Sequence, residues 1–293
     1  MPRLASRCTR ATLPRLRQRE RARHHRGHRS RRCPARRRTV EYGPVPDNIA
    51  VSPAEVALVL DGVRNSAARL TATLAPLTNL QAREPSALPG WSRGHVLTHL
   101  ARSADVYRWL LTLARTGTEP GPRADTATLD RALHAGAGRK GTELVADLRT
   151  SLDGLLDEAA SMPAERWTVL VTALAGWQHP AWFTLRRCRR ELETHHADLN
   201  LDYTTANWPA DYVTWALDDT LTALAAHHFP VARIKAEDLD RSWTLSATGP
   251  TVTGPGHTLL AWLAGRRTDL QLHSDLPLPT PPRWPLPPVP GWN

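Results

Sequence analysis

A glutamate and a histidine four residues apart are the first sign of chemistry in this sequence. Glu191 and His195 lie in the segment RRELETHHADL. On a helix, both side chains leave from one face, one turn apart, and a carboxylate and an imidazole placed so can chelate a divalent ion. A solvated pair on an exposed helix is the commoner reason for this spacing, so a partner segment has to decide between the two interpretations.

The segment GHVLTHL offers such a partner, because His95 and His99 are again four residues apart. Both histidines can instead be partly buried residues bonded to backbone carbonyls. Facing helices of a bundle bring side chains within a few ångströms of each other, and His and Glu from two helices are how bundle metal sites are built. Two histidines and one carboxylate leave an open coordination position, as in catalytic zinc sites. We therefore predict a divalent metal between the two segments.

Three further polar residues follow from the helical spacing around His195. Asp198 comes three residues later and can orient a ligating imidazole by a hydrogen bond from behind. Glu193 and His196 lie on other faces of the same helix, and we expect them to face solvent.

Four long amphipathic helices are available to position these side chains. Ser52-Pro53-Ala54-Glu55 combines an N-cap, a proline at the first helical position and a glutamate two residues further on, and begins a helix over residues 53–75. Apolar periodicity predicts further helices at 92–114, 141–160 and 180–199, with a break at Gly117 to Pro122. Four such helices joined by polar loops predict a four-helix bundle.

Beyond about residue 205 the pattern changes to that of a small α+β module. Pro209 opens one more helix, and the alternating segments Ser242–Ala247 and Leu270–His273 flank the helical segment Thr258–Ala264. The fold class is therefore mainly α, with a four-helix bundle followed by a small α+β C-terminal domain. We divide the chain into a tail at 1–48, the bundle at 49–205 and the small domain with its proline-rich end at 206–293.

The basic charge of the 293-residue chain belongs to its first segment. Residues 1–40 hold 15 of the 38 basic residues and one of the 28 acidic ones, so the remainder has 23 basic and 27 acidic residues and a charge of −4. The low apolar content of residues 1–48 and their self-repulsion predict disorder. The excess charge therefore gives no reason to expect nucleic acid as a partner of the folded part.

Three interpretations of the basic segment stay open. It can bind nucleic acid or anionic lipid as a polybasic arm. A secretory signal is disfavoured because the apolar stretch that such signals need is missing. We favour a start codon assigned too early, with Val40, Val45 or Val51 near the true beginning.

The cysteine count and the distribution of apolar residues indicate in which cellular compartment the folded part lies. Cys188 is the single cysteine after residue 40, and we expect it to be buried and structural. A disulfide framework is thereby excluded there, which suits a reducing compartment. No apolar run of about 18 residues occurs, so no membrane span is expected. The predicted location is cytoplasmic.

The sequence also resembles a known family. The segments GWSRGHVLTHLARSAD, TG at 116–117, RRELETHHADL and LLAWLAGR at 259–266 occur in the order and spacing typical of the actinobacterial mycothiol-dependent maleylpyruvate isomerase family. The resemblance covers about residues 50–285 and implies a DinB-like bundle followed by the family's second domain. It implies zinc on His99, Glu191 and His195, and it implies that His95 is not a ligand.

One position departs from the family pattern. The family carries a catalytic arginine about a dozen residues after the TG turn, and an ungapped count places Leu129 there. Arg123 and Arg131 lie nearby and are the candidate catalytic residues if the loop is shifted. The alternative is that both are surface residues and that the isomerase chemistry has changed.

The activity implied by the resemblance is metal-activated thiol chemistry with mycothiol as the thiol. A free thiol with a pKa of about 8.5 is mostly protonated at neutral pH, and a coordinating metal deprotonates it. Addition of the thiolate to the cis double bond of maleylpyruvate, rotation and elimination would give fumarylpyruvate, with an arginine holding the carboxylates. The alternatives are a mycothiol S-transferase acting on another electrophile, favoured if Leu129 replaces the arginine, and a non-enzymatic metal-binding protein.

Overall fold

The computed structural model of the protein describes residues 51–266 and 272–282. The tail predicted at residues 1–48, the start of the segment Leu270–His273 and the last residues of the proline-rich end lie outside these ranges. Residues 275–282 form no helix or strand, and all but two of them are exposed.

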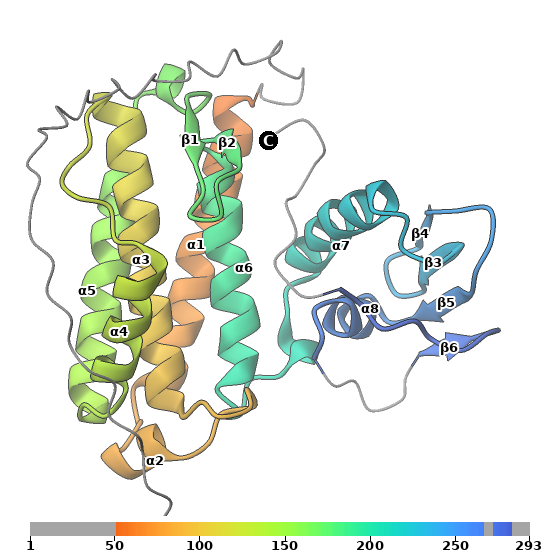
Figure 1. Ribbon diagram of the computed structural model, residues 1–293, viewed down its shortest axis with the longest axis horizontal. Coiled ribbons are helices and arrows are strands. Elements are labelled where there is room, and N and C mark those ends of the chain that lie inside the picture. Colours follow the sequence, from red (N-terminus) through yellow and green to blue (C-terminus); the bar gives the residue numbers. More distant parts are fainter. Residues whose placement is uncertain (1–50, 267–271, 283–293) are drawn as a thin grey trace, which may run out of the picture. The chain divides into compact units, whose positions relative to one another are not determined.

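Four long helices form the predicted bundle (Figure 1). They are α1 (Pro53–Leu74), α3 (Arg93–Thr116), α5 (Gly141–Ala160) and α6 (Phe183–Asp198). Helix α3 packs against α5 and α6, and α1 packs against α6 and α5. The mainly helical fold class and the four helices of the bundle are therefore confirmed.

Local sequence signals determine where the bundle helices begin and end. At α1, the Ser52 side chain accepts the Glu55 N–H while the Glu55 carboxylate accepts the Ser52 N–H, which is the predicted capping box. Helix α3 begins after Ser92 and ends at Gly117, whose φ of 72° is the left-handed conformation that glycine adopts without strain. The TG turn is thus the end of α3.

Several shorter elements were not predicted. Helix α2 (Asn79–Arg83) precedes α3, and α4 (Thr126–Ala137) packs along α3. A two-stranded hairpin of β1 (Leu170–Thr172) and β2 (Gln178–Pro180) leads into α6. Two 3₁₀ turns occupy Ala164–Arg166 and Thr205–Asn207. Helix α4 and the hairpin matter most, because both border the candidate site.

The C-terminal part is the predicted α+β module. It contains α7 (Ala210–Ala226), α8 (Gly256–Leu263) and a sheet of order β4-β3-β5-β6. The strands are β3 (Arg233–Ala236), β4 (Arg241–Thr244), β5 (Thr251–Gly254) and β6 (His273–Ser274). Strand β3 runs antiparallel to β4 and parallel to β5. The predicted segments Ser242–Ala247 and Thr258–Ala264 overlap β4 and α8, and the segment Leu270–His273 shares only His273 with β6. Strands β3 and β5 were missed.

Buried apolar residues form two separate clusters. One runs from Val56 to Leu199 within the bundle, and the other from Tyr203 to Leu263 within the α+β module. All described residues nevertheless fall within one compact unit of the chain, so the domain boundary near residue 205 stays a prediction. Cys188 is a free thiol, 2% exposed in the bundle core, as expected. Within the described ranges, every helix is too short or too polar to cross a bilayer.

Candidate metal centre and adjoining cavities

The structure brings together His99 of α3 and Glu191 and His195 of α6. His99 Nε2 lies 2.9 Å from Glu191 Oε2, and His195 Nε2 lies 3.4 Å from the same oxygen. The two imidazole rings meet edge to face, with centroids 4.7 Å apart. Two helices distant in sequence therefore present two imidazoles and one carboxylate to a common point.

These three side chains suit a divalent metal. One ligand atom from each lies within 4.8 Å of the others. Ligand atoms bound tetrahedrally to zinc at about 2.0–2.1 Å are separated by about 3.3 Å. The two distances from Glu191 Oε2 to the imidazole nitrogens, 2.9 and 3.4 Å, are close to that value. Two imidazole nitrogens and a carboxylate oxygen are also a donor set that zinc accepts while keeping one coordination position open.

The outer nitrogen of His195 is held by a carboxylate, as predicted for Asp198. His195 Nδ1 lies 2.9 Å from Asp198 Oδ2, and Asp198 is 1% exposed. Arg266 donates two hydrogen bonds to the same carboxylate, at 2.6 and 3.1 Å. Because a carboxylate accepts, His195 carries its proton on Nδ1 and its Nε2 is directed at the cluster. Arg266 was not predicted, although it lies in the segment LLAWLAGR.

His95 does not join the cluster, because it caps its own helix. Its Nδ1 accepts the Ser92 backbone N–H at 3.2 Å, while its own N–H is directed at the Ser92 hydroxyl. In a capping box the third helical residue is usually a glutamate or glutamine, whose side chain accepts the backbone N–H of the N-cap residue. In α3 the His95 imidazole accepts this N–H instead. Burial and the neighbouring His134 lower the pKa of His95. His99, one turn later, is the histidine of this pair that reaches Glu191.

The electrostatics of the cluster favour a cation. Burial alone would raise the pKa of Glu191, but hydrogen bonds to His195 and His99 outweigh it and hold that pKa well below its usual range. Burial alone would lower the pKa of His195, yet its bonds to Asp198 and Glu191 raise it to about 9. Glu191 is therefore an anion at neutral pH, and without a metal its charge is balanced by the protonated His195 imidazole. A divalent ion would take the place of the proton on His195 Nε2.

Glu193 and His196 are buried, so the prediction that they face solvent is wrong. The Glu193 carboxylate accepts hydrogen bonds from Arg69 and Tyr203. The ring of His196 stacks on Tyr203 at 3.6 Å, and its Nε2 is 2.9 Å from the Thr73 hydroxyl. The physical reason is that α1 and the segment after α6 cover the faces of α6 that the spacing alone left open.

Two cavities share the cluster as part of their walls. Trp91, His99 and Glu191 border both of them. The smaller cavity has a volume of about 230 Å³ and is also lined by Arg190, Thr194, His195 and Arg266. The larger has a volume of about 330 Å³ and is also lined by Arg102, Ser103, Val106, Tyr107, Thr126, Leu129, Asp130, Leu133, Leu174 and Arg187.

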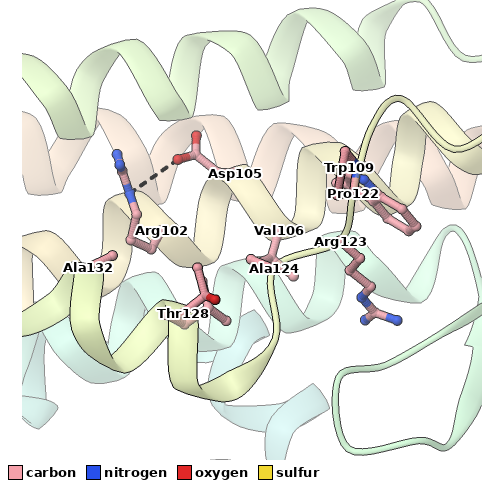
Figure 2. Close-up of a pocket in the computed structure, with 10 residues that line it drawn as sticks. Arg102, Asp105, Val106, Trp109, Pro122, Arg123, Ala124, Thr128 and Ala132 are labelled. Carbon is pink, nitrogen blue, oxygen red and sulfur yellow. Dashed lines mark ion pairs between the residues drawn. The ribbon is translucent and has the colours of Figure 1, made fainter.

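The candidate catalytic arginines take different positions. Arg131 is exposed on α4, where it donates to the Thr128 hydroxyl at 2.9 Å. Arg123 is half-buried before α4, with its guanidinium 5.4 Å from the centre of the Trp109 ring. It lines a third cavity, shown in Figure 2, at the opposite end from the Arg102–Asp105 ion pair. A catalytic part for either arginine stays a prediction.

Leu129 borders two of the three cavities. Its side chain lines both the larger cavity beside the cluster and the third cavity, which Arg123 also lines. The unpredicted helix α4 begins after Asp125, whose carboxylate accepts the Thr128 N–H at 2.7 Å. Leu129 therefore reaches the cavity from the first turn of α4.

Sequence reasoning missed Tyr107 and Arg187 of the larger cavity. The Tyr107 hydroxyl is directed at Glu191 Oε1, 3.4 Å away. Arg187 lies four residues before Glu191, so the spacing that joins Glu191 to His195 also extends one turn back to this arginine. Extending the four-residue pattern along RRCRRELETHH would have found Arg187, whereas nothing near Tyr107 in the sequence singles it out.

Comparison with known proteins agrees with this architecture. Residues 63–200 match the family described as the mycothiol maleylpyruvate isomerase N-terminal domain. The fold matches crystal structures of the mycothiol-dependent maleylpyruvate isomerase and of its variant with one histidine replaced by alanine. Each has a TM-score of 0.71 and 22% sequence identity, over 78% of this chain and 97% of that chain. None of the curated proteins compared with the chain matches it.

Proposed function

We propose that the chain, whose residues 63–200 match the mycothiol maleylpyruvate isomerase N-terminal domain family, is a metal- and mycothiol-dependent isomerase of maleylpyruvate. The observation that carries the proposal is the convergence of His99, Glu191 and His195 where two cavities meet. A metal bound there would be reached from both cavities.

Each residue of the centre has a definite part in holding the metal. His99 and His195 would bind it through Nε2, and Glu191 through Oε2. A divalent ion in such a site supplies the charge that turns a coordinated thiol into a thiolate at neutral pH. Asp198 keeps the imidazole of His195 in the required tautomer, and Tyr107 is placed to donate to the remaining oxygen of Glu191.

The two cavities provide for two reactants. A thiol and an electrophile have to approach the same point from different sides for a new bond to form between them. The smaller cavity lies toward Arg266 and the larger toward α4 and the hairpin. In a site with this arrangement, the thiol end of mycothiol and the maleylpyruvate double bond would approach the metal from different cavities.

A second candidate function is a mycothiol S-transferase, which joins the thiol to another electrophile without releasing an isomer. The observation that favours it is Leu129, an apolar side chain lining the larger cavity at the position where the family pattern places an arginine. A leucine in place of the arginine makes this part of the cavity wall apolar. Such a wall suits an electrophile with fewer charges than maleylpyruvate.

An assay of the zinc-loaded full-length chain with mycothiol distinguishes the two functions. Maleylpyruvate is offered with and without mycothiol, and products are separated by chromatography. Thiol-dependent formation of fumarylpyruvate supports the isomerase, and a stable mycothiol conjugate without isomer supports the transferase. Zinc binding with neither product would contradict both and leave a metal-binding protein without this activity.

A further inference from the structure

Arg187 is placed to act together with the cluster. It lies on α6 four residues before Glu191, and both residues line the larger cavity. Side chains separated by one helical turn have Cβ atoms about 5–6 Å apart. A compact molecule reacting at the cluster would therefore come within reach of the Arg187 guanidinium.

Two aromatic rings fix the position of this guanidinium. It lies 5.1 Å from the centre of the Tyr107 ring of α3 and 5.1 Å from that of Trp177 in the hairpin. Cation–π contacts attract the guanidinium without cancelling its charge. The rings therefore limit the movement of Arg187 and leave its positive charge available.

The hydrogen-bond partner of Arg187 is neutral. His179 is 0% exposed, and its Nδ1 is 2.9 Å from the carbonyl oxygen of Pro180. A carbonyl only accepts, so the His179 proton is on Nδ1 and its Nε2 accepts from Arg187 Nη1 at 3.0 Å. A carboxylate in this place would have neutralised the arginine, whereas a neutral imidazole orients it and leaves the charge uncompensated.

The other arginines around the two cavities each pair with a carboxylate. Arg190 pairs with Asp219 at 2.7 Å, and Arg266 pairs with Asp198. Arg102 is held by two carboxylates, at 2.7 and 3.2 Å. Among the described residues no carboxylate pairs with Arg187, so it is the cavity arginine whose charge lacks a protein counter-ion.

Arg123 adds to the positive potential near Arg187. Its Nε and Nη2 are buried and have no hydrogen-bond partner within the described part of the chain. Burial and the charge of Arg187 lower the pKa of Arg123, which places the two cations close enough to repel each other. Figure 2 shows Arg123 at the end of its cavity away from Arg102. Two repelling guanidiniums in partly buried surroundings favour an anion beside them.

We propose that Arg187 binds a carboxylate of the electrophile, so that the centre selects compact carboxylate-bearing electrophiles over neutral ones. This inference rests on the proposed function for the identity of the reaction, but the carboxylate site itself can be measured by binding alone. A bidentate contact between guanidinium and carboxylate would fix which end of the substrate is directed at the cluster.

Maleate, a small cis-dicarboxylate, is the probe for this site, and dimethyl maleate is its neutral counterpart. Binding to the zinc-loaded full-length chain is measured by calorimetry for the unchanged protein, Arg187→Met, Arg187→Lys and Arg64→Met. Arg64 is an exposed arginine of α1 that pairs with Asp61 and serves as the matched control. Zinc content and circular dichroism are recorded for every variant.

We expect Arg187→Met to weaken maleate binding about 10–100-fold, the loss typical of one charged hydrogen-bonded pair. Zinc content and dimethyl maleate binding should stay unchanged, Arg187→Lys should retain part of the affinity, and Arg64→Met all of it. Equal maleate affinity in folded Arg187→Met, or no maleate binding by the unchanged protein, would overturn the proposal. If Arg187→Met does not fold, a preference of Arg187→Lys for maleate over dimethyl maleate as strong as that of the unchanged protein would overturn it too.

The turnover assay of the proposed function, run on the same variants, separates this proposal from that function. Maleate binding that depends on Arg187, in a protein that turns over neither maleylpyruvate nor mycothiol, supports the carboxylate site and contradicts the enzyme. Turnover that persists with unchanged KM and kcat in Arg187→Met supports the enzyme and contradicts the carboxylate site.

Discussion

Asp198 Oδ2 lies 2.9 Å from His195 Nδ1, on the side of the imidazole away from the cluster. The two hydrogen bonds from Arg266 hold this carboxylate in place. The carboxylate that orients His195 thus comes from Asp198, three positions later on the same helix. Arg266, which follows α8, holds that carboxylate in place. Burial alone would raise the pKa of Asp198, but bonds to His195 and Arg266 lower it, so it is an anion at neutral pH.

Asp198→Asn should weaken zinc binding about 10–100-fold, the usual effect of losing a carboxylate behind a ligating histidine. The amide keeps the size of the side chain but loses the charge that favours the required tautomer. Competition with a fluorescent chelator measures the affinity. Asp61→Asn, on the exposed face of α1, is the control, and an unchanged zinc affinity in Asp198→Asn would contradict the role given to this carboxylate.

Gly94→Ala should destabilise the protein, although alanine favours helices over glycine by about 1 kcal/mol. A Cβ at Gly94 would lie 2.2 Å from the carbonyl oxygen of Ala137, so α4 would have to move away from α3. Gly138→Ala is the matched control, because nothing lies within 4 Å of its Cβ position. We expect urea unfolding to show a loss of more than about 1 kcal/mol for Gly94→Ala. Equal stability of the two variants would show that Ala137 of α4 does not lie against Gly94 of α3.

Glu193→Ala should cost about 2–3 kcal/mol of unfolding free energy, because it leaves the buried Tyr203 hydroxyl and the partly exposed Arg69 guanidinium without their acceptor. Glu193→Gln keeps an acceptor oxygen and should cost less. Thermal unfolding measures both, with the exposed Glu143→Ala as the reference. A cost of Glu193→Ala no larger than that reference would mean that the carboxylate is solvated.

Acid should destabilise the fold through His179. Burial first, and then the charge of Arg187, lower its pKa from 6.5 to about 3. Between these values the unfolded chain binds a proton that the folded chain does not, so stability falls as pH drops below 6.5 and is fully present above it. Between pH 6.5 and 4.5 the loss from this residue should be about 2–3 kcal/mol.

Urea unfolding at pH 7 and pH 4.5 measures this contribution. His179→Gln removes the titrating group, so its stability should change less with pH than that of the unchanged protein. The difference between the two pH dependences isolates His179 from the other titrating residues. Identical pH dependences would show that folding does not lower the pKa of His179 and would contradict its burial as a neutral imidazole.

The sequence alone was sufficient for the long helices, because their signals are local and strong. The Ser52–Glu55 capping box is a pattern specific to the start of a helix, and the leucines of residues 141–160 recur at the spacing of a helix. The short hairpin before α6 escaped prediction because strands of three residues carry too little alternation to be recognised. Helix α4 has Leu129 and Leu133 on one side and mostly exposed residues on the other, so its periodicity is weak.

The same distinction applies to the site. The four-residue spacing of Glu191 and His195 was visible because both lie on one helix. Which faces of α6 are covered depends on α1 and on the chain after Leu199, so the burial of Glu193 and His196 was not visible. The position of the Arg187 guanidinium and its uncompensated charge depend on Trp177 and His179 of the hairpin. Because the hairpin was not predicted, these two properties of Arg187 could not be predicted either.

The zinc content of His99→Ala tests the central claim most directly. The full-length chain and the variants His99→Ala and His95→Ala are purified identically, loaded with zinc, dialysed and measured by atomic emission. We predict about one zinc per chain in the unchanged protein and in His95→Ala, and a sharp loss in His99→Ala. Full zinc occupancy in His99→Ala would contradict the claim that the two helices hold one metal between them.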